Sequence, residues 1–159
     1  MQLAIISDSH HALDTLAKLL HHLDESNIRL LIHAGDFITS GVESVFKAHP
    51  NITTHIALGN CDYRSEEMQK LQALSHVTVE EVVHLNLENR SIAVSHIEGV
   101  AQNAMRGVHV DAFVHGHTHR PRIEKIGEIL YLNPGSLMED AGYLKVELPS
   151  FEIDRKLRF

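Results

Sequence analysis

Residues 3–25 read LAIISDSHHALDTLAKLLHHLDE, an apolar run followed by a polar junction and then by an amphipathic stretch. The run LAIIS at 3–7 has the length and composition of a short buried strand. Over residues 11–25 the leucines recur three or four positions apart, which places them on one stripe of a helix; they are Leu13, Leu16, Leu19, Leu20 and Leu23. The stretch therefore predicts a strand that leads into a helix, with Asp8 and His10 at the junction.

The same pattern recurs twice further along the chain. RLLIHAG at 29–35 precedes a predicted helix near 41–48, and THIALGN at 54–60 precedes another near 64–74. Three successive strand–helix units favour a mostly parallel sheet covered by helices.

Beyond residue 76 the sequence becomes rich in strand patterns. We expect two strands in 77–96 around a turn at Asn89 and Arg90, a strand at 110–116, and hairpins at 122–132 and 143–157 that turn at Gly127 and Pro149. The expected fold is α/β, with two sheets packed face to face and helices outside. No linker or repeat divides the chain, so we expect residues 1–159 to form one domain.

Composition and charge exclude several classes of protein. The chain has 14 Lys plus Arg against 21 Asp plus Glu, a formal net charge of −7, and no basic block suited to a phosphate backbone, so we expect no dedicated nucleic-acid partner. Its single cysteine excludes an internal disulfide, and its N-terminal apolar run is short and lacks a basic flank. No apolar stretch approaches the roughly 20 residues of a membrane helix. These features favour a soluble protein of the reducing cytoplasm with no membrane partner, and leave homo-oligomerisation open.

Polar clusters follow five of the predicted strands, in the order SDSH, HAGDF, LGNCD, VSHIE and HGHTH. Because ligands bind at the carboxyl ends of strands in open α/β sheets, these clusters are expected to converge on one crevice. Their metal-binding side chains are Asp8, His10, Asp36, Asn60, His96, His117 and His119. Carboxylate, amide and imidazole groups suit manganese, iron, nickel or zinc better than a soft cation. Seven donors exceed the needs of one catalytic zinc, so two metals that share a carboxylate fit the count.

Local spacing predicts how these donors are presented. In an extended segment residues i and i+2 point to the same side, so Asp8 with His10, and His117 with His119, are expected to face the metals. Glycines beside the donors, Gly35, Gly59 and Gly116, would allow sharp turns or close backbone approach. His33 is expected to have a hydrogen-bonded core role, and His115 to support the site or to be simply buried.

Structural interpretations compete with the functional ones at three positions. Asp8 is also compatible with a cap for the helix near Ala12, and Asp62 with a cap for the helix near Arg64. NPGS at 133–136 is typical of a tight turn.

The ordered set D-x-H, G-D, G-N-C-D, a lone histidine after a strand, G-H-T-H and N-P-G-S spans Asp8 to Ser136. It resembles the calcineurin-like metallophosphoesterases, in particular their small bacterial and archaeal phosphodiesterases. The resemblance implies a four-layer αββα sandwich of two mixed sheets flanked by helices, and a dinuclear metal centre. It implies Asp8, His10 and His119 on one metal, Asn60, His96 and His117 on the other, and Asp36 bridging them.

The chain departs from the common family pattern in two places. Cys61 stands where many members have a histidine that assists the leaving group. At residues 96–99 the chain has HIEG, where many members have H-G-H. We expect Asn60 and Cys61 to contact the substrate phosphate, and Asn60 and Asp62 to act in catalysis.

The predicted function is that of a metal-dependent phosphodiesterase acting on a small phosphate ester. Two divalent transition-metal ions, manganese first and nickel, iron or zinc as alternatives, would activate a bridging hydroxide. A phosphomonoesterase or nucleotide hydrolase on the same centre is the first alternative. A non-catalytic binding module of the same fold, like the eukaryotic retromer subunit that has lost a ligand histidine, is disfavoured because all seven donors are retained. A metal-storage or metal-sensing protein is a third possibility, which turnover of a diester would exclude.

Overall fold

The computed structural model describes residues 1–63 and 65–157. The predicted helix start near Arg64 lies outside these ranges, and the described helix begins at Glu66.

The first sheet has six strands in the order β11-β10-β1-β2-β3-β4. Its parallel part consists of β1 (Gln2–Ile6), β2 (Leu30–His33), β3 (Thr53–Ala57) and β4 (Val77–Glu80). Helices α1 (Leu13–Glu25), α2 (Val42–Lys47) and α3 (Glu66–Gln72) connect these strands, which confirms the three strand–helix units. The antiparallel hairpin β10 (Gly142–Glu147) and β11 (Glu152–Leu157) extends the sheet beyond β1.

The second sheet has five strands in the order β5-β6-β7-β9-β8. Its centre is parallel and consists of β6 (Arg90–Val94), β7 (Ala112–Val114) and β9 (Ile129–Asn133). The edge strands β5 (Val83–Leu87) and β8 (Arg122–Ile126) pair antiparallel with their neighbours. Helix α4 (Glu98–Ala104) joins β6 to β7, and the short helix α5 (Leu137–Asp140) follows β9.

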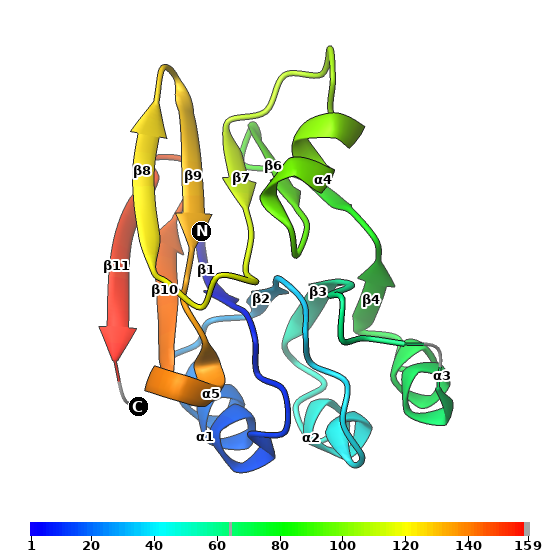
Figure 1. Cartoon of the computed structure of the whole chain (residues 1–159). Coiled ribbons are helices and arrows are strands. Elements are labelled where there is room, and N and C mark those ends of the chain that lie inside the picture. The colour runs from blue at the N-terminus through cyan, green and yellow to red at the C-terminus, as the bar shows by residue number, and fades with distance from the viewer. Residues whose placement is uncertain (64, 158–159) are drawn as a thin grey trace.

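The two sheets and their helices form four layers. In Figure 1, α1, α2 and α3 lie below the first sheet, and α4 lies on the opposite side of the molecule beside the second sheet. This arrangement confirms the predicted αββα sandwich. In the described part of the chain, no helix is long and apolar enough to span a membrane.

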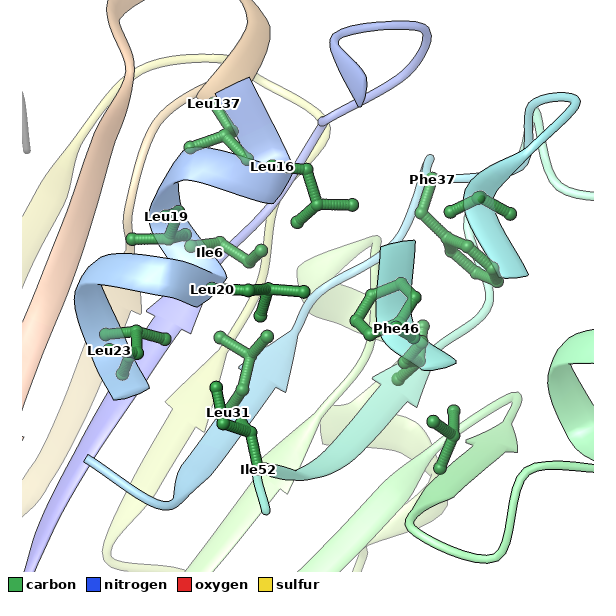
Figure 2. Packing of buried hydrophobic residues seen from close by; sticks show 14 of the residues in the cluster. Ile6, Leu16, Leu19, Leu20, Leu23, Leu31, Phe37, Phe46, Ile52 and Leu137 are labelled. Carbon is green, nitrogen blue, oxygen red and sulfur yellow. The ribbon is translucent and has the colours of Figure 1, made fainter. Parts of the chain in front are cut away.

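Apolar side chains fill the space between each pair of layers. The leucine stripe of α1 packs on Ile6 and Leu31 of the first sheet, together with Phe37, Phe46 and Ile52 (Figure 2). The preceding residue of β1, Ile5, points the other way and packs between the sheets with Ile92 and Val114. Each buried aliphatic side chain of this kind contributes about 1.5–3 kcal/mol. The strands that carry the polar loops are therefore packed on both faces by the hydrophobic core.

The region 77–96 departs from the prediction of two strands. It contains three, because β4 pairs with β3 in the first sheet and the chain then crosses to the second sheet, where β5 and β6 form a hairpin. That hairpin turns at Glu88 and Asn89, with φ of 49° and 61°, and Arg90 already belongs to β6. Two left-handed residues are the geometry of the tight turn that matches the twist of paired strands. The hairpins at 122–132 and 143–157 are confirmed.

Candidate metal centre

The polar loops at the strand ends are tied to one another by backbone hydrogen bonds. In the loop after β1, the Asp8 amide donates to the carbonyl of Gly35 at 2.9 Å, and the His10 amide donates to that of Asp36 at 2.8 Å. In the second sheet, the Gly116 amide donates to the carbonyl of His96 at 3.0 Å. The predicted convergence of these clusters is therefore what the fold produces.

Acidic and imidazole side chains gather where these loops meet. Among the described residues, three groups place one ligand atom from each member within 4.8 Å of the others; they are Asp8 with His10 and His119, Asp8 with Asp36 and His96, and His10 with Asp36 and Cys61. Asp8 and Asp36 each belong to two groups, so the groups form one continuous cluster.

The buried carboxylate of Asp8 lies at the centre of this cluster. Its Oδ1 atom faces the Nε2 atoms of His119 at 3.2 Å, His96 at 3.9 Å and His10 at 4.0 Å. Within the described residues, neither Asp8 Oδ1 nor His96 Nε2 has a hydrogen-bond partner, although both atoms are buried. Leaving such groups unsatisfied costs about 1–3 kcal/mol each, and more for a charged group. Imidazole and carboxylate lone pairs that face one another fit a divalent transition metal.

Asp36 occupies the neighbouring position. Its Oδ2 atom lies 3.3 Å from Nε2 of His96 and 3.9 Å from Nε2 of His10, so it faces histidines of two different groups. Its Oδ1 atom accepts a hydrogen bond from the backbone amide of Cys61 at 2.8 Å.

His117 and Asn60 lie at the rim of the cluster. The ring of His117 packs against that of His96 with centroids 5.2 Å apart, but His117 belongs to none of the compact groups found among the described residues. Asn60 is exposed and lines a shallow cavity of about 320 Å³ together with His96. The exposed Cys61 lies beside it, and its hydrogen bond to the Asp36 carboxylate raises the pKa of the thiol.

The backbone does not present these donors as we predicted. Instead of an extended segment, the donors at the junctions lie in turns with positive φ: Asp8 at 52°, His10 at 41°, Asp36 at 57°, His117 at 65° and His119 at 58°. Non-glycine residues rarely adopt this region, and when they do so they cluster at functional sites. The predicted alternation along an extended segment is therefore wrong, because these donors lie in turns of left-handed residues.

The glycines have the role expected of them. A Cβ atom on Gly116 would lie 1.8 Å from Oγ of Ser7, and one on Gly59 would lie 2.1 Å from Oδ1 of Asp36. Gly35 adopts a φ of +94°, and a Cβ there would lie 2.7 Å from Nδ1 of His96. These close approaches let loops from both sheets meet around the two carboxylates.

Asp62 is a connector between two loops. Its carboxylate accepts four backbone amides, from Asp36 at 2.9 Å and from Phe37, Ile38 and Gly59 at 2.8 Å each. The capping prediction for Asp62 is wrong, since Ser65 caps α3 by accepting the Met68 amide at 3.1 Å.

The capping prediction for Asp8 is wrong as well. The N-cap residue of α1 is Ala12, and no side chain of the described residues caps that helix. The turn that contains Asp8 directs its carboxylate into the cluster of histidines.

His33 and His115 support the loops from inside the protein. The fully buried His33 accepts the Gly35 amide at Nδ1, at 3.2 Å, and its Nε2 contacts Oγ of Ser9 at 2.8 Å. Burial lowers the pKa of His33 to about 3, so it is neutral at physiological pH. His115 is buried, and its Nε2 lies 3.3 Å from Glu98. The predicted core role of His33 is confirmed.

The NPGS segment holds two other loops in place. Nδ2 of Asn133 donates to the Gly116 carbonyl at 2.8 Å, and Oγ of Ser136 donates to the Asp8 carbonyl at 3.1 Å. The interpretation of NPGS as a structural turn agrees with these contacts.

Glu139 is a residue that the sequence analysis missed. Its Oε1 lies 2.6 Å from Nδ1 of His119, and this contact raises the pKa of His119 above its ordinary value. Glu139 is one of 21 acidic residues and lies six residues beyond the end of β9, inside a helix, so the pattern of polar clusters directly after strands could not single it out.

Comparison with known proteins gives a consistent result. Phosphodiesterase MJ0936 of Methanocaldococcus jannaschii is 26% identical over 152 residues, which cover 91% of this chain and 87% of that protein. Phosphodiesterase YfcE of Escherichia coli is 28% identical over 152 residues, covering 86% of this chain and 79% of its own length. The structure of an archaeal phosphodiesterase matches the fold with a TM-score of 0.84 at 20% identity, over 99% of this chain and 100% of that one. A family model, the calcineurin-like phosphoesterase superfamily domain, matches residues 1–155. The chain therefore belongs to the calcineurin-like phosphoesterase superfamily.

Proposed function

We propose that this chain is a metal-dependent phosphodiesterase whose cluster of acidic and imidazole groups holds two divalent cations. The observation that carries the proposal is the Asp8 carboxylate, which is buried against three imidazole nitrogens and lacks a hydrogen bond at Oδ1 within the described residues. The carboxylate oxygen and the imidazole lone pairs repel one another unless a cation lies between them or the imidazole nitrogens carry protons. The donor types suit a transition metal.

The contacts support a division of the donors between two ions. Asp8, His10 and His119 form one compact group and would hold the first ion. His96, with Asn60 and His117 beside it, would hold the second. Asp36 faces both His10 and His96 at 3.9 and 3.3 Å, which supports its assignment as the shared ligand.

Two such cations, when bound, would supply Lewis acidity that lowers the pKa of water at the site and makes hydroxide available at neutral pH. The protein's own groups bind and orient the phosphate. Asn60 and Cys61 lie exposed at the rim, where the amide of Asn60 can donate to a phosphate oxygen. Asp62 acts in this proposal by fixing the loops that carry Asp36 and Asn60, because its two oxygens already accept four amides.

The substrate in this proposal is a small phosphate ester. The cavity beside Asn60 and His96 has a volume of about 320 Å³, and the chain has a net charge of −7, which does not favour a long polyanion. Manganese is the cation that we expect first, with nickel, iron or zinc as alternatives, because the donors are oxygen and nitrogen atoms.

The test is a comparison of a diester with its matching monoester. Metal-stripped protein receives manganese, nickel, zinc or magnesium, and is assayed with bis(4-nitrophenyl) phosphate and with 4-nitrophenyl phosphate. We expect no turnover without metal and faster turnover of the diester with manganese. Faster turnover of the monoester would favour a phosphomonoesterase on the same centre. Metal binding without turnover of either ester would favour a non-catalytic module.

A further inference from the structure

The short segment after β9 contacts the turn of the metal cluster that contains Asp8. Ser136 donates its hydroxyl to the Asp8 carbonyl at 3.1 Å, and the amides of Leu137 and Met138 donate to the carbonyls of Ser7 and Asp8 at 2.9 and 3.2 Å. Ser136 also caps α5, because its Oγ accepts the Glu139 amide at 3.3 Å. One hydroxyl therefore connects the Asp8 turn to the helix that carries Glu139.

Glu139 extends this connection to His119, which belongs to the same group of donors as Asp8 and His10. Its Oε1 lies 2.6 Å from Nδ1 of His119, while Nε2 of that ring lies 3.2 Å from Oδ1 of Asp8. An imidazole that donates a proton from Nδ1 to a carboxylate keeps the Nε2 lone pair free. Histidines that bind metals commonly make such an outer hydrogen bond, which fixes the tautomer and the ring orientation and raises the basicity of the ligand nitrogen.

His96, a histidine that faces the same Asp8 oxygen, is supported differently. Nδ1 of His96 contacts the Ala34 carbonyl at 2.8 Å, so a neutral backbone oxygen fixes its tautomer. His119 is the more exposed of the two rings, with 29% of its side chain accessible against 2% for His96. An exposed ring is held less firmly by packing than a buried one. The orientation of the His119 ring therefore depends more on its hydrogen-bond partner, the Glu139 carboxylate, than the orientation of the His96 ring depends on the Ala34 carbonyl.

We propose that Glu139 is a positioning residue that orients His119 through Nδ1. It thereby sets the affinity with which the site of Asp8, His10 and His119 binds its cation. The inference rests on the proposed function for its consequence in catalysis, but its first consequence is in metal binding. Loss of the carboxylate weakens this one site and leaves the site of His96 unchanged. Removal of a polar group that hydrogen-bonds to a metal ligand typically changes the metal affinity about 10–100-fold.

The experiment measures manganese binding to the full chain by titration calorimetry. Glu139→Ala is expected to bind one ion with wild-type affinity and the other about 10–100-fold more weakly. Glu139→Gln keeps an acceptor of the same size without the charge, and is expected to recover part of this loss. The matched control is Asp140→Asn, which removes the neighbouring charge of the same helix but alters a side chain that pairs with Arg155.

Thermal unfolding of the metal-free variants separates positioning from folding. All three are expected to unfold close to the wild-type temperature, because the backbone contacts of α5 remain. Two wild-type affinities in Glu139→Ala, or equal losses in Glu139→Ala and Asp140→Asn, would overturn the proposal. A wild-type protein that binds two ions but turns over no diester would contradict the proposed function, and the binding result for Glu139 would still stand.

Discussion

Gly116 is placed where a loop of the second sheet meets a loop of the first. A Cβ atom at this position would lie 1.8 Å from Oγ of Ser7 and 2.7 Å from Oδ2 of Asp8, so Gly116→Ala must push the loops apart. We expect a loss of about 1–3 kcal/mol in the free energy of unfolding, the usual cost of overpacking, and weaker metal binding.

Gly99 in α4 is the matched control for this substitution. Among the described atoms, none lies within 4 Å of the Cβ that alanine would add there. Gly99→Ala should leave stability unchanged or raise it by up to about 1 kcal/mol, because alanine favours helices. Urea unfolding of both variants measures the difference. Equal effects of the two substitutions would contradict the close approach at Gly116.

We predict that Cys61 determines how the rate depends on the leaving group. A thiol is a weak hydrogen-bond donor, and the Asp36 carboxylate raises its pKa further, so it assists a departing alkoxide poorly. We expect activity to fall steeply as the pKa of the leaving group rises, and Cys61→His to flatten that dependence. General acid catalysis typically contributes about 10²–10⁴-fold. Rates over a series of substituted aryl diesters provide the measurement, and an identical shallow dependence in both proteins would show that Cys61 takes no part.

At the scale of the elements, Asp62 ties the loop after β3 to the loop after β2. Each of its two oxygens accepts two amides, so Asp62→Asn leaves two amide donors without an acceptor. The cost is about 1–3 kcal/mol for each unsatisfied group, and we expect a lower midpoint of urea unfolding. Diester hydrolysis should fall by a similar factor for every leaving group, since the substitution displaces the loop. A loss confined to basic leaving groups would instead identify Asp62 as the proton donor.

The long strand–helix units were predictable because their patterns are local. Leu16, Leu20 and Leu23 repeat with the helical period, and each strand is an apolar run that ends in polar residues. The crossing between sheets at Glu81 and Val82 was not predictable, because both strands beside it alternate alike and only tertiary pairing separates them. Helices α4 and α5 were missed because they carry no apolar stripe: in each of them the only side chain that the structure describes as buried is Ala101 or Leu137, respectively.

The candidate site was predictable in its composition but not in its geometry. Donor types and their positions after strands are properties of the sequence, and they placed Asp8, Asp36 and His96 together. The left-handed turns at Asp8 and His117 make hydrogen bonds to loops distant in the chain, and so does the carboxylate of Asp62. Such contacts leave no local pattern.

For the whole molecule, the buried His33 couples folding stability to pH. The folded chain keeps this ring neutral down to about pH 3, whereas the unfolded chain protonates it near its ordinary pKa of 6.5. Between these values the unfolded state binds the additional proton, so stability falls as the pH is lowered, with a slope from this group of up to about 1.4 kcal/mol per pH unit. His33→Gln removes the titrating group and should lose less stability than wild type between pH 7 and pH 5. Urea unfolding at both pH values measures the slopes, and equal slopes would show that His33 is protonated in the folded state.

We propose that two cations, joined by Asp36, make this chain a phosphodiesterase. The most direct measurement is diester turnover as a function of bound manganese, determined by elemental analysis during stepwise addition to metal-stripped protein, for wild type and Asp36→Asn. We expect wild-type activity to reach its full value only when two ions are bound per chain. Asp36→Asn should fold, bind fewer than two ions and show no turnover, because the shared carboxylate is lost. If the wild type is fully active with one ion or none, two cations are not required. If Asp36→Asn binds two ions and turns over at the wild-type rate, Asp36 is not the required shared ligand.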